Sequence, residues 1–386
     1  MKKIILLITA ISISIGAVAQ KGKVTAASSF IDQGALDKAK EAIDLALQDE
    51  KSKDWTNTYF VKGKLCQAIY VADNPAYNSL YTDPLAEAYA SYQKAIELDP
   101  KGGTKNKIIA QQIYNILIGQ LSNQGAKRYE AQDFEGAYNS FLTQIKASES
   151  GLYVGPIDTG MYFNTALTAF NAKKFNESMK YYEKCAEMKY LGLTPYLQIS
   201  QCYLGLGDTA KAENYLLNLK DKFPEDNTVF ITIADFYLKN NKPDEALNYI
   251  EISKKKDPTN YSLYWAAGVT YLNQKKFDEA IADLTKSIEL KSDLFDSHYA
   301  LGATYINKAA ALLEKANDEM DLNKFNVLFN QANEVYAKAI PPMEKALELK
   351  PGDIDTMRSL KELYYRLKMT EKFDAMKAKI DALENK

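Results

Sequence analysis

The amino-acid sequence predicts an all-α protein built from repeated pairs of antiparallel helices. Short segments that open a helix end on residues 178, 212, 246 and 280, so they recur every 34 residues. Aromatic residues keep the same step in two series, which are Tyr162, Tyr196, Phe230 and Tyr264, and Tyr203, Tyr237, Tyr271 and Tyr305. A fixed period of this length indicates a repeat architecture in which each unit packs only on its neighbours.

The amino terminus, residues 1–19, has the pattern of a secretory signal peptide. Two lysines precede an apolar run over residues 4–15, and residues 17–19 match the small-residue cleavage pattern. The run is shorter than the roughly 20 residues of a spanning helix, which favours cleavage before Gln20 over an uncleaved anchor. No second apolar run of spanning length follows, and the leader resembles those of bacteria. We therefore expect an exported protein of the periplasm, outer envelope or extracellular space, without a membrane span after cleavage.

The first part of the mature chain, residues 20–150, is expected to form divergent, lengthened helix pairs. Apolar residues recur at helical spacing, and clusters of Asn, Asp, Gly and Pro separate the helices. The expected pairs cover residues 23–47, 59–98 and 105–147, and the last opens with one long helix over about 105–129. Matching small residues lie 49, 49 and 41 residues apart, at Ala39, Ala88, Ala137 and Ser178.

The second part, residues 151–386, is expected to hold the regular units. The stretch over 148–160 carries three glycines and a proline, and it is the candidate joint between the two parts. Beyond Tyr305 the next matching helix end arrives 25 residues late, so we expect an extended hairpin near 306–350. The charged helix pair that follows suits a C-terminal capping unit, which needs a polar outer face.

The repeating positions resemble those of the tetratricopeptide repeat family. In the unit over residues 261–290, Tyr264 occupies the position of the family's Trp, Gly268 that of its Gly and Tyr271 that of its Tyr. Ala280 occupies the small position of the second helix. The resemblance implies a right-handed superhelical solenoid of about nine antiparallel helix pairs. It also implies a non-catalytic scaffold or adaptor that binds another protein or peptide in a concave groove lined by the first helices.

Carried over by position, the resemblance predicts which side chains face this groove. They are Phe163, Leu197, Gln201, Ile231, Asp235, Lys239, Trp265, Asn273, Tyr299 and Asn307. Such a groove would offer an apolar and aromatic ladder with a polar edge to an extended or helical peptide. The alternative is that part of the ladder is core between repeats, as helical Leu and Ile usually are. We expect Trp265 and Tyr299 to make contact, because aromatic residues are enriched at binding hot spots.

Other partners are weighed against the same positions. The chaperone-binding subgroup places Lys where the regular units hold Phe163 or Leu197, so we do not expect heat-shock chaperone tails to bind. Glycan binding by Trp265, Tyr299 and the asparagines is one alternative to peptide binding. A recruiting subunit of an envelope secretion or motility assembly is another. The sequence leaves the partner's identity and the oligomeric state open.

Charge and motifs exclude several functional classes. The chain has 48 Lys and Arg against 50 Asp and Glu, whereas nucleic acid and anionic membranes call for a basic stripe. It has no Gly-rich phosphate loop, no His-Glu-x-x-His pattern and no Gly-x-Ser-x-Gly pattern. We therefore expect no catalytic residues, no metal and no cofactor. The single histidine, His298, falls in an aromatic position of the repeat, and we expect it to pack.

Three cysteines are an odd number and too few for a disulfide framework. Cys185 and Cys202 fall on consecutive helices, so a disulfide between them is one interpretation for an exported protein. The other is that both are buried thiols that pack as small apolar residues. We favour buried thiols, because a disulfide requires Cα atoms within about 7 Å of each other.

Overall fold

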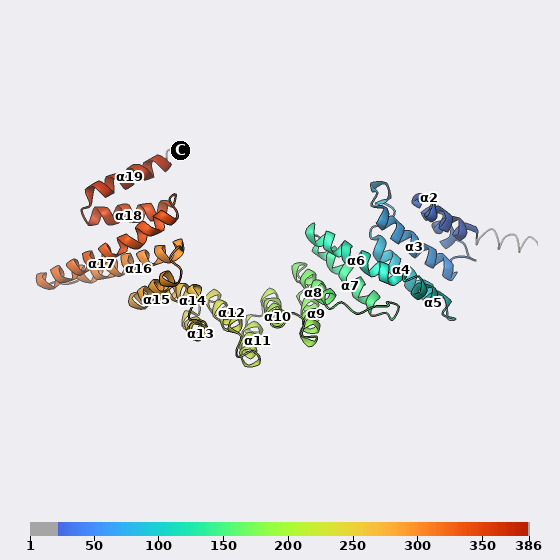
Figure 1. The fold of residues 1–386 in the computed structure, drawn as a ribbon, viewed down its shortest axis with the longest axis horizontal. Helices are drawn as coiled ribbons and strands as arrows, with labels where there is room; N and C mark the ends of the chain where they lie inside the picture. The colour runs from blue at the N-terminus through green and yellow to red at the C-terminus, as the bar shows by residue number, and fades with distance from the viewer. Residues whose placement is uncertain (1–21, 385–386) are drawn as a thin grey trace, which may run out of the picture. The chain divides into compact units, whose positions relative to one another are not determined.

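The computed structural model describes residues 22–384, which form helices and no strand. The signal peptide expected over 1–19, with its cleavage before Gln20, lies outside these described residues. The chain divides into two compact units, residues 1–212 and residues 213–386. Figure 1 labels the helices of both units, and each unit is described by itself.

The first unit opens with a helix over residues 22–32. It continues with α2 (Leu36–Leu47), α3 (Thr56–Ala72), the short 3-10 helix η1 (Pro75–Tyr77), α4 (Pro84–Glu97), α5 (Gly103–Ala110), α6 (Ile113–Glu130), α7 (Phe134–Ser148), α8 (Gly160–Asn171), α9 (Phe175–Glu187) and α10 (Thr194–Gly205). Helix α11 (Thr209–Lys222) spans the division between the units. Within the unit, α3 packs on α4, α6 on α7, and α8 on α9, which gives successive helix hairpins.

The second unit repeats the same hairpin. Its helices after α11 are α12 (Asn227–Lys239), α13 (Pro243–Lys256), α14 (Tyr261–Asn273), α15 (Phe277–Leu290), α16 (Phe295–Asn317), α17 (Leu322–Leu349), α18 (Ile354–Arg366) and α19 (Thr370–Glu384). Consecutive helices from α12 to α19 pack on one another. The prediction of an all-α array of helix pairs is therefore confirmed.

The same turn joins the two helices of each regular pair. Its central residue has a positive φ, and four such residues lie 34 positions apart: Lys173, Gly207, Asn241 and Lys275. The next backbone N–H then bonds to the carbonyl five residues back, as from Lys276 to Tyr271 at 2.9 Å. This is the Schellman ending of a helix, which satisfies carbonyls that the helix itself leaves without donors.

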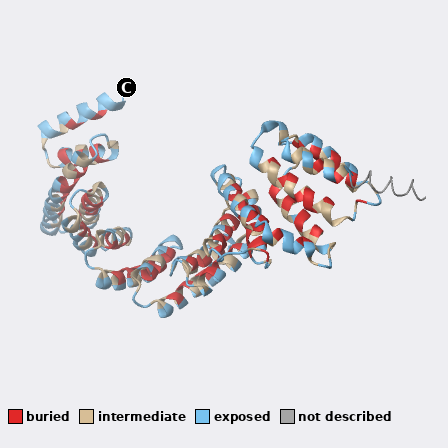
Figure 2. Cartoon of the chain, turned by 45° about the vertical axis from the view of Figure 1, so that its right-hand side comes forward, coloured by how far each residue is buried: buried red, intermediate tan, exposed pale blue. Residues whose placement is uncertain are grey.

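Small residues allow the two helices of a pair to approach closely. Ala166 and Ala234 are buried on first helices, and Ala246 and Ala280 are buried on second helices. At Gly268 a Cβ atom would lie 2.6 Å from Cγ of Leu284, so this position of α14 admits no side chain without a shift of α15. Figure 2 shows the buried residues on the sides where helices face each other.

One expected helix is wrong. The helix predicted over about 105–129 is two helices, α5 and α6, separated by Gln112 with a φ of 50°. Ile108 and Ile113 are both buried against the same core. Five residues apart on one continuous helix they would point roughly 140° apart, so the break brings both into the core.

The glycine-rich stretch over 148–160 does not interrupt packing. Tyr162 of α8 donates a 2.6 Å hydrogen bond to Glu149 at the end of α7, and Met161 packs with Ile145 of α7. The compact units are instead divided between Ala212 and Glu213, within α11. The division of the chain at residue 150, which rests on repeat length, stays a prediction.

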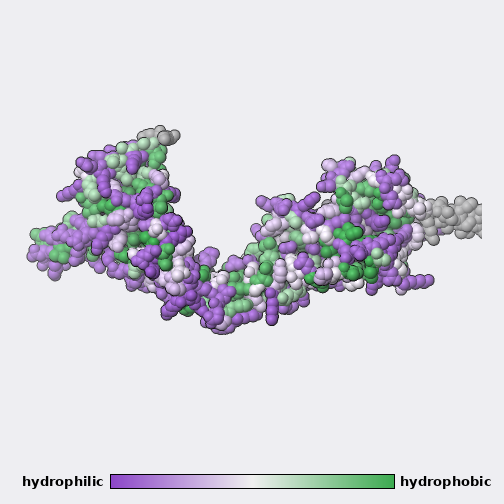
Figure 3. Space-filling view, in the orientation of Figure 1, coloured by the Kyte–Doolittle hydropathy of each residue, from purple (hydrophilic) through white to green (hydrophobic). Residues whose placement is uncertain are grey.

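Helices α16 and α17 form a hairpin of greater length than the regular pairs, with 23 and 28 residues. In Figure 1 its end projects past the neighbouring α15 and α18. Figure 3 shows hydrophobic residues among hydrophilic ones at this projecting end. Two prolines, Pro341 and Pro342, lie inside α17, where the hairpin meets the last helix pair.

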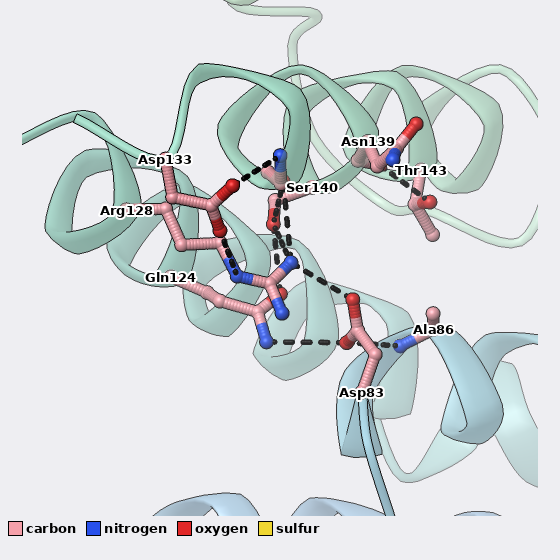
Figure 4. Close-up of polar contacts among 9 residues, drawn as sticks. Asp83, Ala86, Gln124, Arg128, Asp133, Asn139, Ser140 and Thr143 are labelled. Atoms are coloured by element: carbon pink, nitrogen blue, oxygen red, sulfur yellow. Dashed lines mark hydrogen bonds and ion pairs between the residues drawn. The ribbon is translucent and has the colours of Figure 1, made fainter. Parts of the chain in front are cut away.

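A polar cluster ties three helices of the first unit together. Arg128 of α6 donates from Nη1 to Asp83 at 2.8 Å and to Ser140 of α7 at 2.9 Å. Asp83 also caps α4, because its carboxylate accepts from the backbone N–H of Ala86 at 3.2 Å. Gln124 donates to the same carboxylate and accepts from Ser140 (Figure 4). The cluster thereby fixes the start of α4 against the pair formed by α6 and α7.

Candidate peptide-binding surfaces

The predicted groove residues of the first unit differ in exposure. Phe163 is half-buried, and its ring packs edge-on against Tyr182 at 5.6 Å and Tyr190 at 6.3 Å between centroids. Phe163 therefore contributes to the core of its own helix pair. Leu197 is half-buried and Gln201 is exposed, both on α10.

In the second unit two of the three predicted apolar groove residues contact the core. Ile231 packs against the cluster that joins α12, α13 and α14. Tyr299 packs against the core of α17 and α18 and stacks on Phe295 at 5.7 Å, and burial raises the pKa of its hydroxyl. Trp265 of α14 is 37% exposed, so it is the most open of these three positions.

The polar residues of the predicted groove are exposed. Asp235 and Lys239 form a 2.6 Å ion pair one helical turn apart on α12. Asn273 and Asn307 lie on α14 and α16, and both are exposed. These residues therefore leave polar groups open on the first helices that also carry Ile231, Trp265 and Tyr299. That the predicted residues form one groove stays a prediction.

Sequence reasoning missed a hollow surface between α3 and α6. These are the first helices of two consecutive pairs. One hollow of about 330 Å³ and another of about 380 Å³ adjoin along them, and Val71 lines both. Val71 is 65% exposed and Ile116 is 55% exposed, although both are large apolar residues. We refer to the two hollows together as the α3–α6 groove.

Amide side chains edge the α3–α6 groove. Gln67 donates to Gln120 across the two helices at 2.7 Å, and Gln67 accepts from the hydroxyl of the buried Tyr92 at 2.5 Å. The first bond links α3 to α6, and the second links α4 to α3. Gln111 lines the same hollow and is exposed at the break between α5 and α6. The groove therefore combines an apolar surface with amides that donate and accept hydrogen bonds, which suits a peptide main chain.

In the sequence, the types of residue on α3 and α6 indicate this groove, whereas the 34-residue period does not. The first-half units are longer than 34 residues, so positions could not be carried over from the regular units. Val71 and Ile116 also fall at helical positions that pattern reasoning assigns to a core. What marks the groove is the spacing of Gln67 and Val71 on one turn of α3, with Ile116 and Gln120 on one turn of α6.

The remaining candidate residues have packing roles. Cys66, Cys185 and Cys202 are free, buried thiols, and Cys202 donates to Ser178 at 3.4 Å. Burial raises the pKa of Cys185 to about 11. His298 is buried, with its Nε2 2.9 Å from the carbonyl oxygen of Ser292.

Across residues 22–384, His, Cys, Asp and Glu side chains form no group of three or more that could hold a metal ion. In the same range no helix has both the length and the apolar composition to cross a membrane.

Family models match the central part of the chain. Models described as tetratricopeptide repeat match residues 159–190, 196–226 and 231–294. No curated protein matches the chain. The matched residues lie on α8 to α15, which are the helices with the regular period.

Solved structures of repeat proteins are also similar. One is described as YrrB, a TPR protein with an unusual peptide-binding site, with 18% identity, a TM-score of 0.38, and coverage of 52% of this chain and 91% of that chain. Another is MamA from Desulfovibrio magneticus RS-1, with 19% identity, a TM-score of 0.39, and coverage of 49% and 93%.

Proposed function

We propose that this tetratricopeptide repeat protein is a non-catalytic scaffold that holds a peptide segment of a partner protein. The α3–α6 groove is the observation that carries the proposal. It exposes Val71 and Ile116 on two helices that the hydrogen bond from Gln67 to Gln120 links. A preformed groove loses little conformational freedom on binding, so more of the contact energy appears as affinity.

The chemistry of the groove favours a peptide with apolar side chains. Val71, Ile113 and Ile116 offer apolar surface, and Gln111 adds an amide that can pair with a main-chain N–H or carbonyl. At the far end Lys127 and Asp73 form an exposed ion pair at 3.7 Å. Glu130 in the same hollow and Lys64 in the adjoining one add one charge of each sign, so the lining of the groove as a whole is balanced in charge. The occupant is therefore an uncharged, apolar segment in extended or helical form.

Trp265 is a second contact point, in the other unit. Its ring is 37% exposed on a first helix, whereas Ile231 and Tyr299 at equivalent positions contact the core. Aromatic side chains that stay partly open often anchor a partner. We propose that Trp265 anchors a partner segment independently of the α3–α6 groove.

The place of action that we propose is the envelope of a bacterium or the space outside it. The support is the leader pattern over residues 1–19. A scaffold there would recruit a partner to an envelope assembly, such as one for secretion or motility.

The α3–α6 groove is tested with peptides selected from a displayed random library on the purified chain. Affinity of a selected peptide is measured by isothermal titration calorimetry. Val71→Asp and Ile116→Asp are expected to weaken binding at least about tenfold, because each buries a charge under the peptide. Val154→Asp, an equally exposed valine in the α7–α8 loop, is the control and should leave affinity unchanged.

Equal affinity of the peptide for the wild type and both groove variants would overturn the assignment of this groove. A glycan in place of a peptide is distinguished by Trp265 fluorescence. A shift on addition of soluble oligosaccharides that disappears in Trp265→Phe would favour glycan binding, since the remaining Trp55 would still report general effects.

A further inference from the structure

The end of α17 together with α18 and α19 repeats the arrangement of α13, α14 and α15. Lys275 and Lys368, 93 positions apart, both have a positive φ in the turn before the last helix of the set, of 60° and 55°. Asn260 and Asp353, also 93 apart, both cap the middle helix, and each middle helix has 13 residues. Residues 93 apart therefore occupy equivalent positions in the two sets.

In the earlier set a charged bridge fills the space between α13 and α15. Lys254 of α13 forms a 2.6 Å ion pair with Asp283 of α15, and only 11% and 13% of these side chains are exposed. The Nζ atom of Lys254 also lies 4.7 Å from the centre of the Tyr264 ring on α14. Polar groups that pair with one another therefore occupy this space.

In the last set apolar side chains take all three of these positions. They are Leu347 of α17, Met376 of α19 and Met357 of α18. The three residues line a hollow of about 750 Å³ between the helices, to which Leu360 and Leu383 also contribute. The three helices meet at the C-terminal end of the chain (Figure 1). We call this space the C-terminal hollow; it lies where the earlier set has its charged bridge.

The acidic groups at the rim of the C-terminal hollow are already paired. Glu344 accepts hydrogen bonds from Nζ of Lys372 and from the hydroxyl of Tyr364, both at 2.7 Å. Glu348 forms a 2.6 Å ion pair with Lys345. Neither carboxylate therefore adds an unbalanced negative charge to the hollow.

Lys379 of α19 adds an unbalanced positive charge to the rim. Its equivalent in α15, Lys286, forms a 3.1 Å ion pair with Glu289 one turn later. In α19 the place of Glu289 is taken by Ala382, which also lines the hollow. Within the described residues no carboxylate lies within ion-pair distance of Lys379, whose side chain is exposed. The hollow thus combines an apolar lining with one available cation.

We propose that the C-terminal hollow binds a free long-chain carboxylate, with its alkyl chain along Met357 and Met376 and its carboxylate at Lys379. Sites for small organic molecules have volumes of this size and mostly apolar linings with a few polar groups. Methionine side chains are unbranched and flexible, so they adapt to an alkyl chain. Burial of the chain provides most of the affinity, and the exposed Lys379 selects an anionic head.

The lining favours an alkyl chain over a peptide. A peptide main chain brings N–H and carbonyl groups that need partners when they are buried. The C-terminal hollow has no amide side chain in its lining, the Tyr364 hydroxyl is bonded to Glu344, and Pro351 has no N–H. The α3–α6 groove differs in this respect, because amide side chains edge it. An alkyl chain needs no such partners.

Isothermal titration calorimetry of dodecanoate on the purified chain tests the site, below the concentration at which dodecanoate forms micelles. Saturable binding of one molecule per chain is expected. Octanoate should bind at least about tenfold more weakly, because it has four fewer CH₂ groups to bury. Lys379→Gln should weaken dodecanoate binding about two- to fivefold, as loss of an exposed ion pair does. Lys286→Gln, at the equivalent position of α15, is the control and should leave affinity unchanged.

Two changes to the lining place the ligand. Leu347→Lys combined with Met376→Asp introduces the pair that joins α13 to α15, and it should lower dodecanoate affinity at least about tenfold. Leu383→Asp should have a similar effect, and the residue is 40% exposed, so its replacement leaves the core in place. Leu45→Asp, at a leucine of α2 that is 44% exposed, is the matched control. Circular dichroism checks that every variant is folded.

Absence of saturable dodecanoate binding to the wild type would overturn the proposal. So would equal affinity of the wild type, the double variant and Leu383→Asp, since the ligand would then bind elsewhere. Binding to phosphatidylglycerol vesicles, or to a library peptide that Leu383→Asp releases, without binding of dodecanoate would assign the hollow to another partner and also overturn it. Val71→Asp should keep full dodecanoate affinity, so the result is independent of peptide binding in the α3–α6 groove.

Discussion

Single residues in the left-handed conformation end the first helices of the regular pairs. Only one of the four is glycine, Gly207, while Lys173, Asn241 and Lys275 occupy the same place in the turn. A residue with a Cβ atom is strained there, by about 1 kcal/mol or more. At this repeated position the backbone conformation is therefore the same in each unit, while the residue type varies.

Lys275→Gly is expected to stabilise the chain by about 0.5–1 kcal/mol, because glycine adopts the positive φ without strain. Gly207→Ala should destabilise it by a similar amount for the same reason. The free energy of unfolding is measured by urea denaturation. Lys276→Gly, at the next residue with a φ of −85°, is the control, and a gain there as large as at Lys275 would contradict the explanation.

At the level of single residues, neighbouring side chains decide which of the predicted groove residues are exposed. Phe163 and Tyr299 share one position of the repeat with Trp265, but only Trp265 is as much as 37% exposed among the three. The rings Tyr182 and Tyr190 cover Phe163, and Phe295 stacks on Tyr299. Which neighbours cover a repeated position depends on side chains elsewhere in the unit, which a period does not encode.

At the scale of helices, the start of α4 depends on a side chain from α6. Asp83 caps α4 and also accepts from Arg128 and Gln124, so a single carboxylate serves three contacts. The sequence indicates that Asp83 caps α4, because an Asp followed by a Pro is a common start of a helix. It gave no sign that Arg128, 45 residues later, would lie beside it.

Arg128→Met is expected to lower the free energy of unfolding by about 1–3 kcal/mol, because it leaves the half-buried Asp83 carboxylate without its cation. Lys127→Met is the control. Lys127 is exposed and its ion pair with Asp73 is 3.7 Å long, so the change should stay within about 0.5 kcal/mol. Equal losses in the two variants would show that the cluster does not stabilise the fold in this way.

The break between α5 and α6 marks the limit of helix prediction from periodicity. The residues from 105 to 129 contain no proline, and their apolar residues recur at helical spacing. The break at Gln112 is set by burial of Ile108 and Ile113 in one core, which is a tertiary demand. It also creates one edge of the α3–α6 groove, where Gln111 is exposed.

At the scale of the whole molecule, helix pairs extend beyond the part that sequence profiles identify. Family models match residues within 159–294, whereas hairpins of the same kind occur from residue 22 to residue 384. The unmatched units are those with longer spacings or inserted residues. Packing of small residues between helices is kept there, as at Ala88 and Ala137, even though the period is lost.

Export predicts that the mature chain begins at Gln20. Intact-mass analysis of protein recovered from the envelope of an expressing bacterium should show loss of residues 1–19. Ala19→Leu should block cleavage, because the site requires a small residue at this position. Recovery of the uncleaved wild type in the same fraction would contradict a cleaved leader.

The two prolines inside α17 divide that helix into parts that we expect to open at different rates. Pro341 and Pro342 have no N–H groups, so the carbonyls of Ala337 and Lys338 lack their usual helical donors. The ladder of hydrogen bonds is therefore interrupted within the part of α17 that packs with α18, which includes Tyr336 and Met343. In hydrogen–deuterium exchange, amides over residues 322–331 should exchange earlier than those over 343–349, so the projecting arm would unfold and refold while the helices packed beneath it stay protected.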